Sequence, residues 1–198
     1  MNNIQTRAIV IFVALATLMA ATRFNHFGSA VSLPDASLAV FFLGGLYLSR
    51  SARGSVMIFS ALILEAGCID YYATSVQGVS DWCMTPAYWF LIPTYAGLWL
   101  AGHWCAPGKM VKGRAMESRE LPGLALAAWA SGSFAFIFSN ATFYLFSGRY
   151  TEMSVLEYAA RVAQYYVPYV SVALLYIACA VAIHMAAEII SRQRAHSL

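Results

Sequence analysis

The stretch Ala8–Ala21 reads AIVIFVALATLMAA and contains no charged side chain. The longer run Thr6–Thr22 approaches the roughly 20 residues that a helix needs to cross the hydrocarbon core of a membrane. Arg7 precedes the apolar residues, as in a secretory signal peptide, but the run ends in Ala-Ala-Thr-Arg, which is a poor cleavage site. We therefore expect this run to remain in the protein as a membrane-spanning helix.

The composition agrees with a membrane protein. Of the 198 residues, 61% are hydrophobic and 11% are charged, whereas soluble domains carry about 25% charged residues. The mean hydropathy is +0.64. The net charge of +3 is small, so we interpret the basic residues as topology determinants rather than as a nucleic-acid surface.

Six apolar segments are long enough, or nearly long enough, to cross a membrane. They are Thr6–Thr22, Ser32–Leu48, Ser55–Tyr72, Pro86–Trp104, Leu121–Phe146 and Val162–Ile190. We predict an all-α membrane protein in which residues 1–198 form a single six-helix transmembrane domain. In the second segment, Ser32 as N-cap and Pro34 in the first turn are typical of a helix start, and the strictly apolar part is only Ala36–Leu48.

The basic residues fall mainly in alternate loops. With the N-terminus inside, the cytoplasmic segments hold nine of the twelve: Arg7, Arg50, Arg53, Lys109, Lys112, Arg114, Arg119, Arg192 and Arg194. The opposite side holds Arg23, Arg149 and Arg161. Because lysine and arginine accumulate in cytoplasmic loops, the sequence predicts that both termini are cytoplasmic.

The outer connections carry most of the candidate contact groups. The connection from Asp70 to Thr85 contains no lysine or arginine, and it includes Cys83. The first outer connection carries His26 between phenylalanines, and the third leads to a cluster of tyrosines. We infer an outward-facing bowl lined by aromatic residues, although aromatic belts at the membrane surface remain an alternative for these side chains.

The four cysteines are widely scattered, and no Cys-x-x-Cys pair exists, so neither a zinc site nor a thioredoxin-like dithiol is supported. Cys68 and Cys179 are expected to be small apolar fillers within helices, and Cys105 a structural residue at a helix end. Cys83 differs, because an exposed thiol without a disulfide partner is normally avoided on the oxidising side of a membrane.

Two further features concern Asp70 and the first helix. Asp70 lies near the predicted outer mouth, where it could accept hydrogen bonds from a polar ligand. Ala16 and Ala20 form a small-x-x-x-small pair, which lets another helix approach closely. Packing within the chain is the alternative explanation for that pair.

Three stretches carry a family resemblance: Arg23–Ala30 (RFNHFGSA), Leu33–Phe42 (LPDASLAVFF) and Asp81–Tyr88 (DWCMTPAY). With the six spans and the alanine pair, they resemble the substrate-binding S-components of energy-coupling factor (ECF) transporters, and most narrowly the vitamin B12-specific members of Gram-negative bacteria. The resemblance covers essentially the whole chain. It implies a multi-pass protein of the bacterial inner membrane that takes up cobalamin.

The resemblance also implies roles for individual residues. Cys83 matches the axial ligand of the cobalt of cobalamin, in a family linked to the removal of cyanide from cyanocobalamin. His26, Asp70 and Tyr88 match positions around the corrin ring. Cobalamin is then the substrate, and no cofactor belonging to the protein itself is implied.

The sequence contains no Walker A pattern, so this chain cannot hydrolyse ATP by that route. Related S-components act without a dedicated ECF module. Ala16 and Ala20 nevertheless keep the family motif that contacts the coupling subunit, so partnership with an energising module remains open. No nucleic-acid partner is expected.

The expected cobalt chemistry suits a thiolate, which is a soft and strongly donating ligand. Cys83 lies just before a predicted helix start at Thr85 and Pro86, and a helix N-terminus lowers the pKa of a thiol. The nearby carboxylate of Asp81 opposes this effect.

Other classes of protein fit less well. The main alternative is a haem-binding membrane protein with His26 as axial ligand, although His103 and His184 are predicted near the cytoplasmic side. A disulfide oxidase would need paired outer cysteines. An intramembrane serine protease would need a Gly-x-Ser-x motif, which residues 131–133 do not supply.

Overall fold

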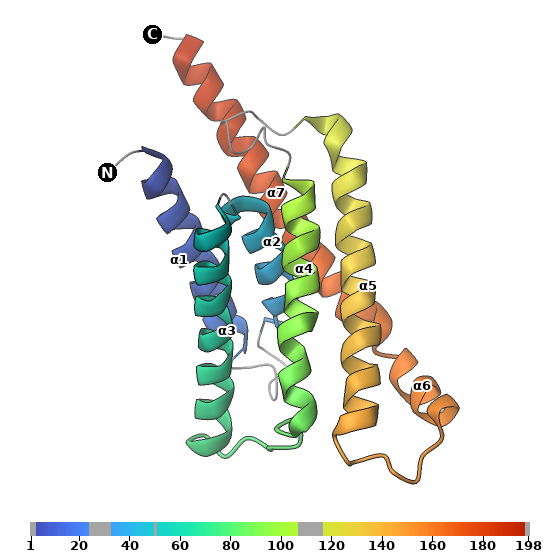
Figure 1. The fold of residues 1–198 in the computed structure, drawn as a ribbon. Coiled ribbons are helices and arrows are strands. Elements are labelled where there is room, and N and C mark those ends of the chain that lie inside the picture. Colours follow the sequence, from blue (N-terminus) through green and yellow to red (C-terminus); the bar gives the residue numbers. More distant parts are fainter. Residues whose placement is uncertain (1–2, 24–32, 50, 107–116, 197–198) are drawn as a thin grey trace.

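The computed structural model describes residues 3–23, 33–49, 51–106 and 117–196. These residues form helices and no strands, so the prediction of an all-α protein is confirmed for the described chain. The elements are α1 (Asn3–Arg23), α2 (Ser37–Leu48), α3 (Ala52–Ser75), η1 (Pro86–Phe90), α4 (Leu91–Cys105), η2 (Ser118–Glu120), α5 (Leu121–Phe146), α6 (Val155–Ala163) and α7 (Tyr166–His196) (Figure 1).

Four of these helices are long and apolar enough to cross a membrane. The spans are Gln5–Arg23, Ala52–Ser75, Ser118–Phe146 and Tyr166–Gln193, and they match four of the six predicted segments. The other two segments correspond to α2, which has only 12 residues, and to η1 continued by the 15 residues of α4.

The start of α2 differs from the prediction. The helix begins at Ser37 with Ala36 as N-cap, so Pro34 precedes the helix rather than lying in its first turn, and Ser32 lies outside the described residues. The carboxylate of Asp35 accepts hydrogen bonds from the backbone N–H of Ser37 at 2.9 Å and from its hydroxyl at 2.6 Å. An aspartate that binds the backbone two residues on stabilises a turn before the helix, and the helix therefore starts later.

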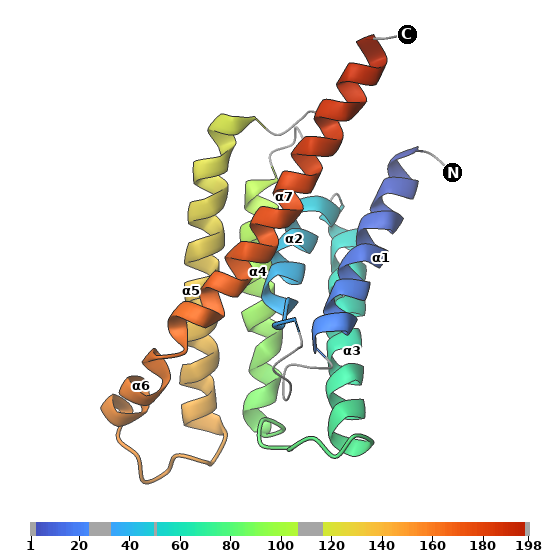
Figure 2. The same ribbon diagram turned by 180° about the vertical axis from the view of Figure 1, so that it is seen from behind.

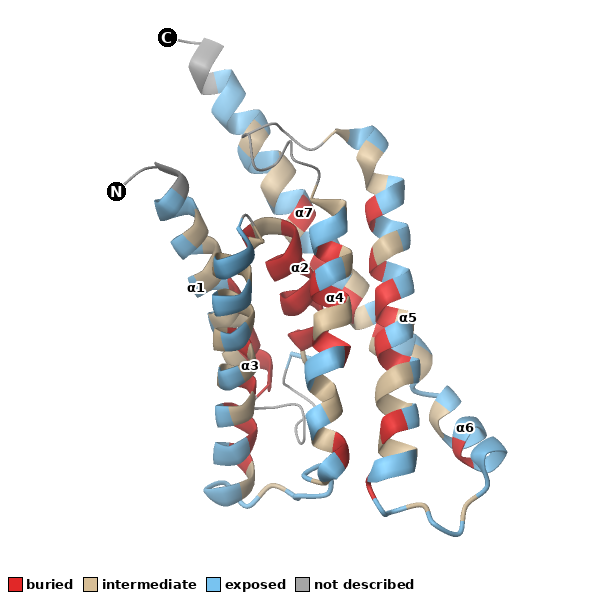
Figure 3. Cartoon of the chain, in the orientation of Figure 1, coloured by how far each residue is buried: buried red, intermediate tan, exposed pale blue. Residues whose placement is uncertain are grey.

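Helix α2 occupies the centre of the bundle. Eleven of its 12 residues are buried, and α1, α3, α4 and α7 pack against it (Figure 2). Figure 3 shows that buried residues make up most of α2 and also occur along α4 and α5. A helix that is apolar on all sides must be enclosed by other elements, which explains how a helix too short to span a membrane becomes the core.

Two glycines allow α2 and α4 to pack backbone against backbone. A Cβ added to Gly45 would collide with the carbonyl oxygen of Trp99, and one added to Gly102 would collide with the carbonyl oxygen of Phe42. Such close approach is typical of small residues between membrane helices. On its other side, the Trp99 indole N–H donates to the Ser55 hydroxyl at 2.9 Å, which joins α4 to α3.

For the last predicted membrane segment, Val162–Ile190, the predicted first residue is wrong. The structure divides this region into α6 and α7, with Gln164 and Tyr165 between them. Pro168 has no N–H to donate to the carbonyl of Gln164, so a continuous helix would lose a hydrogen bond there. Hydropathy alone does not report this break, because the apolar run continues across it.

We predict that Gly45→Ala lowers the free energy of unfolding by about 1–3 kcal/mol, because the added methyl group meets backbone that cannot rotate away. Thermal unfolding of the purified protein in detergent would measure the effect. Gly67→Ala is the matched control, because nothing lies within 4 Å of the added Cβ, and alanine within a helix should stabilise by roughly 0.5–1 kcal/mol. Equal unfolding temperatures for both variants would contradict the proposed close contact.

Candidate functional site

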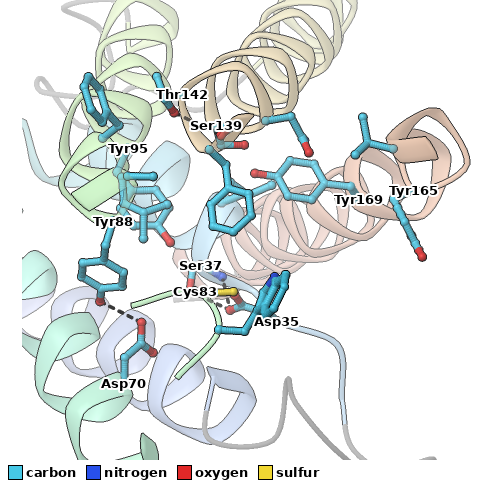
Figure 4. Close-up of a pocket in the computed structure, with 18 of the residues that line it drawn as sticks. Asp35, Ser37, Asp70, Cys83, Tyr88, Tyr95, Ser139, Thr142, Tyr165 and Tyr169 are labelled. Atoms are coloured by element: carbon cyan, nitrogen blue, oxygen red, sulfur yellow. Dashed lines mark hydrogen bonds between the residues drawn. The ribbon is translucent and has the colours of Figure 1, made fainter. Parts of the chain in front are cut away.

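A cavity of about 850 Å³ opens at the end of the bundle where α1 and α3 finish and α7 begins. This volume lies within the roughly 300–1,000 Å³ of small-molecule sites. Its walls come from α1, the segment before α2, α3, η1, α4, α5, α6 and α7. Figure 4 shows Tyr88 and Asp70 on one side, Tyr165 and Tyr169 on the other, and Cys83 between them.

A buried ion pair forms the floor of this cavity. Arg23, at the end of α1, is 4% exposed, and Asp70, in α3, is 6% exposed. The guanidinium donates from Nε to Oδ1 of Asp70 at 2.7 Å and from Nη2 to Oδ2 at 2.6 Å. The remaining nitrogen, Nη1, donates to the hydroxyls of Ser37 at 2.8 Å and Tyr95 at 2.9 Å. One arginine therefore joins the ends of four helices.

The ion pair limits what Asp70 can offer to a ligand. Besides the two bonds from Arg23, its Oδ2 accepts a hydrogen bond from the Tyr88 hydroxyl at 2.8 Å. A carboxylate has about four lone-pair sites, so these three bonds leave about one for another partner. Asp70 lines the cavity as predicted, but its contacts within the described chain are mainly structural.

Cys83 lies in the loop between α3 and η1. The turn is held by hydrogen bonds from the N–H of Met84 to the carbonyl of Asp81 at 2.8 Å and from the N–H of Thr85 to the carbonyl of Cys83 at 2.9 Å. The cysteine is free and exposed, and it lines the cavity. The sulfur is therefore open to a molecule bound there.

The ionisation of Cys83 differs from the sequence expectation. A helical element does begin at Pro86 after Cys83, but it is a 3₁₀-helix of only five residues. Removal of water by the surrounding protein raises the pKa of the Cys83 thiol, the negative charge of Asp70 raises it further, and Arg149 opposes the rise. The acid that raises the thiol pKa is therefore Asp70 of α3 and not, as predicted, the neighbouring Asp81.

The structure brings together three of the four predicted binding residues: Asp70, Cys83 and Tyr88. His26 lies outside the described residues. Ala16 and Ala20 lie on α1 and are half-buried, away from the cavity.

Arg23 and Tyr95 belong to the site but were missed as site residues. Arg23 was interpreted only as an outer charge, although charged groups at the ends of apolar helices tend to pair with one another, which could have suggested Asp70 as its partner. Tyr95 lies inside an apolar helix, and no sequence pattern distinguishes it.

Two described histidines lie outside the cavity, whereas the carboxylate of Asp35 lines it together with Asp70. His103 contacts the Ser49 hydroxyl at 2.7 Å, and His184 lies 3.3 Å from the carboxylate of Glu188; neither lines the cavity. Among the described residues, no group of three or more His, Cys, Asp or Glu side chains could hold a metal ion.

No protein-family model and no curated protein matches this chain. Fold and site together define its class as an all-helical protein with four candidate membrane-spanning helices and a cavity that carries a free thiol. Any assignment within that class depends on the chemistry of the cavity.

We predict that Arg23→Leu lowers the free energy of unfolding by about 3–5 kcal/mol, because it leaves Asp70 buried without its partner. The double variant with Asp70→Leu should recover most of this loss. Chemical unfolding in mixed micelles would measure both.

The exposed pair Arg119–Glu117 supplies the control, because such surface pairs contribute only about 0–1 kcal/mol. If Arg119→Leu destabilised the protein as much as Arg23→Leu, the Arg23–Asp70 pair would not be the main polar contact of the bundle.

Proposed function

We propose that this chain is a BtuM-type S-component, which takes up cobalamin across the bacterial inner membrane with Cys83 as axial ligand of the cobalt. The observation that carries the proposal is the free thiol of Cys83 in the wall of an 850 Å³ cavity. A thiol in that place can bond to a metal centre that enters with the substrate.

The proposed topology has six membrane helices and cytoplasmic termini. In support, α1 begins and α7 ends on the same side of the bundle. The elements at that end carry Arg7, Arg53, Arg119 and Arg192, whereas the opposite end exposes Arg149 and Arg161. The excess of positive charge marks the cytoplasmic side, and the cavity then opens toward the periplasm.

The lining of the cavity suits a corrin, which is a large, partly flat ring edged with amides. Tyrosines such as Tyr165 and Tyr169 offer an apolar ring face and a hydrogen-bonding hydroxyl. Asn140 adds an amide beside them, and its Oδ1 accepts a hydrogen bond from Tyr158 at 3.2 Å. A mixed apolar and polar wall of this kind can contact both the ring and its amide arms.

The proposed chemistry uses the sulfur of Cys83 alone. The corrin ring supplies the equatorial nitrogens of cobalt, so one thiolate is enough to complete an axial bond. Sγ displaces the benzimidazole of the vitamin and donates electrons along the axis, which weakens the bond to a cyanide on the opposite face. The cyanide leaves as an anion with the bonding electron pair, and the oxidation state of cobalt does not change.

Coupling to an energy source is proposed at α1. Ala16 and Ala20 are half-buried, and the neighbouring Val13 and Thr17 are exposed, so this part of the helix can receive another helix. Cobalamin uptake can then proceed in two ways, by the chain alone or together with an ECF module.

We predict that Cys83→Ala abolishes decyanation and removes the change in the cobalamin absorption spectrum that sulfur ligation causes. Spectra of the purified protein and growth of a B12-dependent strain that lacks its own importer would measure the two effects. Cys68→Ala is the control, because this exposed cysteine of α3 does not line the cavity.

A cobalamin spectrum unchanged by the wild-type protein would refute thiolate ligation. A Soret band in the purified protein would instead favour the alternative class of haem-binding membrane proteins.

We further predict that sulfur ligation strengthens as pH rises. A metal binds the deprotonated thiol, and the pKa of Cys83 is raised, so the thiol remains protonated near neutral pH. The apparent association constant for the sulfur-bound complex should rise about tenfold per pH unit between about pH 6 and 8, because one proton is released on binding. Spectral titrations with cyanocobalamin would measure this slope, which a flat profile would contradict.

A further inference from the structure

A second cavity, of about 620 Å³, adjoins the first at the same end of the molecule. It lies between the loop that joins α5 to α6, the helix α6 and the side chain of Trp82. Trp82 and Tyr150 line both cavities. Because Trp82 directly precedes Cys83, the second cavity begins next to the thiol.

The polar groups of this second cavity carry both signs of charge. Arg149 and Arg161 face it together with Glu152 and Glu157. One carboxylate oxygen of Glu157 is already engaged, since it accepts hydrogen bonds from the backbone N–H and the hydroxyl of Ser154 at 3.0 and 2.7 Å. Within the described part of the chain, neither arginine forms an ion pair, so both guanidinium groups can receive an anion.

The aromatic part of the cavity is preorganised by Arg149. Its guanidinium carbon lies 4.4 Å from the centre of the Trp82 ring, which is a favourable cation–π distance. Arginine in this position can still donate two parallel hydrogen bonds to the oxygens of a phosphate. The combination of arginines, an aromatic face and a free carboxylate matches the parts of a nucleotide: phosphate, base and sugar hydroxyls.

We propose that this second cavity binds the phosphodiester-linked nucleotide tail of the corrinoid after Cys83 has displaced its benzimidazole from cobalt. The inference rests on the proposed function. The thiol takes the axial position that the benzimidazole leaves, so the released tail starts on the same face of the ring as Cys83. Trp82, which lines the second cavity, directly precedes Cys83 in the chain, so this cavity gives the tail a place outside the main cavity and close to the sulfur.

The pair cyanocobalamin and cyanocobinamide tests the proposal, because cobinamide has the same ring but no nucleotide tail. Dissociation constants for both would be measured by calorimetry with the purified full-length protein in phospholipid-free detergent. For Arg161→Gln, which leaves the contact of Arg149 with Trp82 intact, we expect cobalamin to bind at least about tenfold more weakly, the usual effect of losing a charge-assisted hydrogen bond. Cobinamide affinity should stay within about twofold of wild type.

Arg192→Gln is the matched control, because it removes an exposed arginine near the end of α7, far from both cavities. It should leave both affinities unchanged. Retained cobinamide binding by Arg161→Gln also demonstrates that the variant is folded.

Three outcomes would overturn the proposal. Equal losses for the two corrinoids would place Arg161 against the ring or in the fold, and no loss for either would show that the tail does not contact this arginine. An effect that appears only in phospholipid nanodiscs would identify a lipid headgroup as the occupant. Failure of the wild-type protein to bind either corrinoid would instead refute the proposed function itself.

Discussion

The bidentate pairing of Arg23 with Asp70 is the contact on which the arrangement around the cavity depends. Both groups are almost fully removed from water, where an unpaired charge would cost several kcal/mol. Every nitrogen of the guanidinium has a hydrogen-bond acceptor within reach, on Asp70, Ser37 or Tyr95. The desolvation cost is therefore offset only when α1, α2, α3 and α4 have all packed together. The ion pair thus favours the correctly assembled bundle over partly assembled ones.

The thiol of Cys83 takes its position from this network and from the opposite wall. Tyr88 lies five residues after Cys83, and its hydroxyl binds Asp70 on the α3 side. Trp82 directly precedes the cysteine, and its ring packs against the guanidinium of Arg149, which lies in the loop between α5 and α6. The short loop that carries the sulfur is thus attached at both ends to charged groups from different helices. The exposed thiol of Cys83 thus has a defined position although its side chain is not packed in the core.

The features that follow from local sequence were predictable, and those that depend on pairing across the chain were not. Apolar run lengths predict α1, α3 and α5 because a membrane span is a local property. Cys83 and Tyr88 were named together because one continuous stretch, Asp81–Tyr88, carries the family resemblance, and both line the cavity. The contact of Arg23 with Asp70 joins residues 47 positions apart, and that of Arg149 with Trp82 requires the α5–α6 loop to return to the α3–η1 loop. No periodicity or composition encodes such pairings.

The glycine contacts between α2 and α4 constrain how the molecule can move. Where carbonyl oxygens of one helix lie against the Cα atoms of another, neither helix can slide or rotate without a steric collision. Tyr95 on α4 and Ser37 on α2 therefore stay fixed relative to each other, and the floor of the cavity moves with them as one rigid unit.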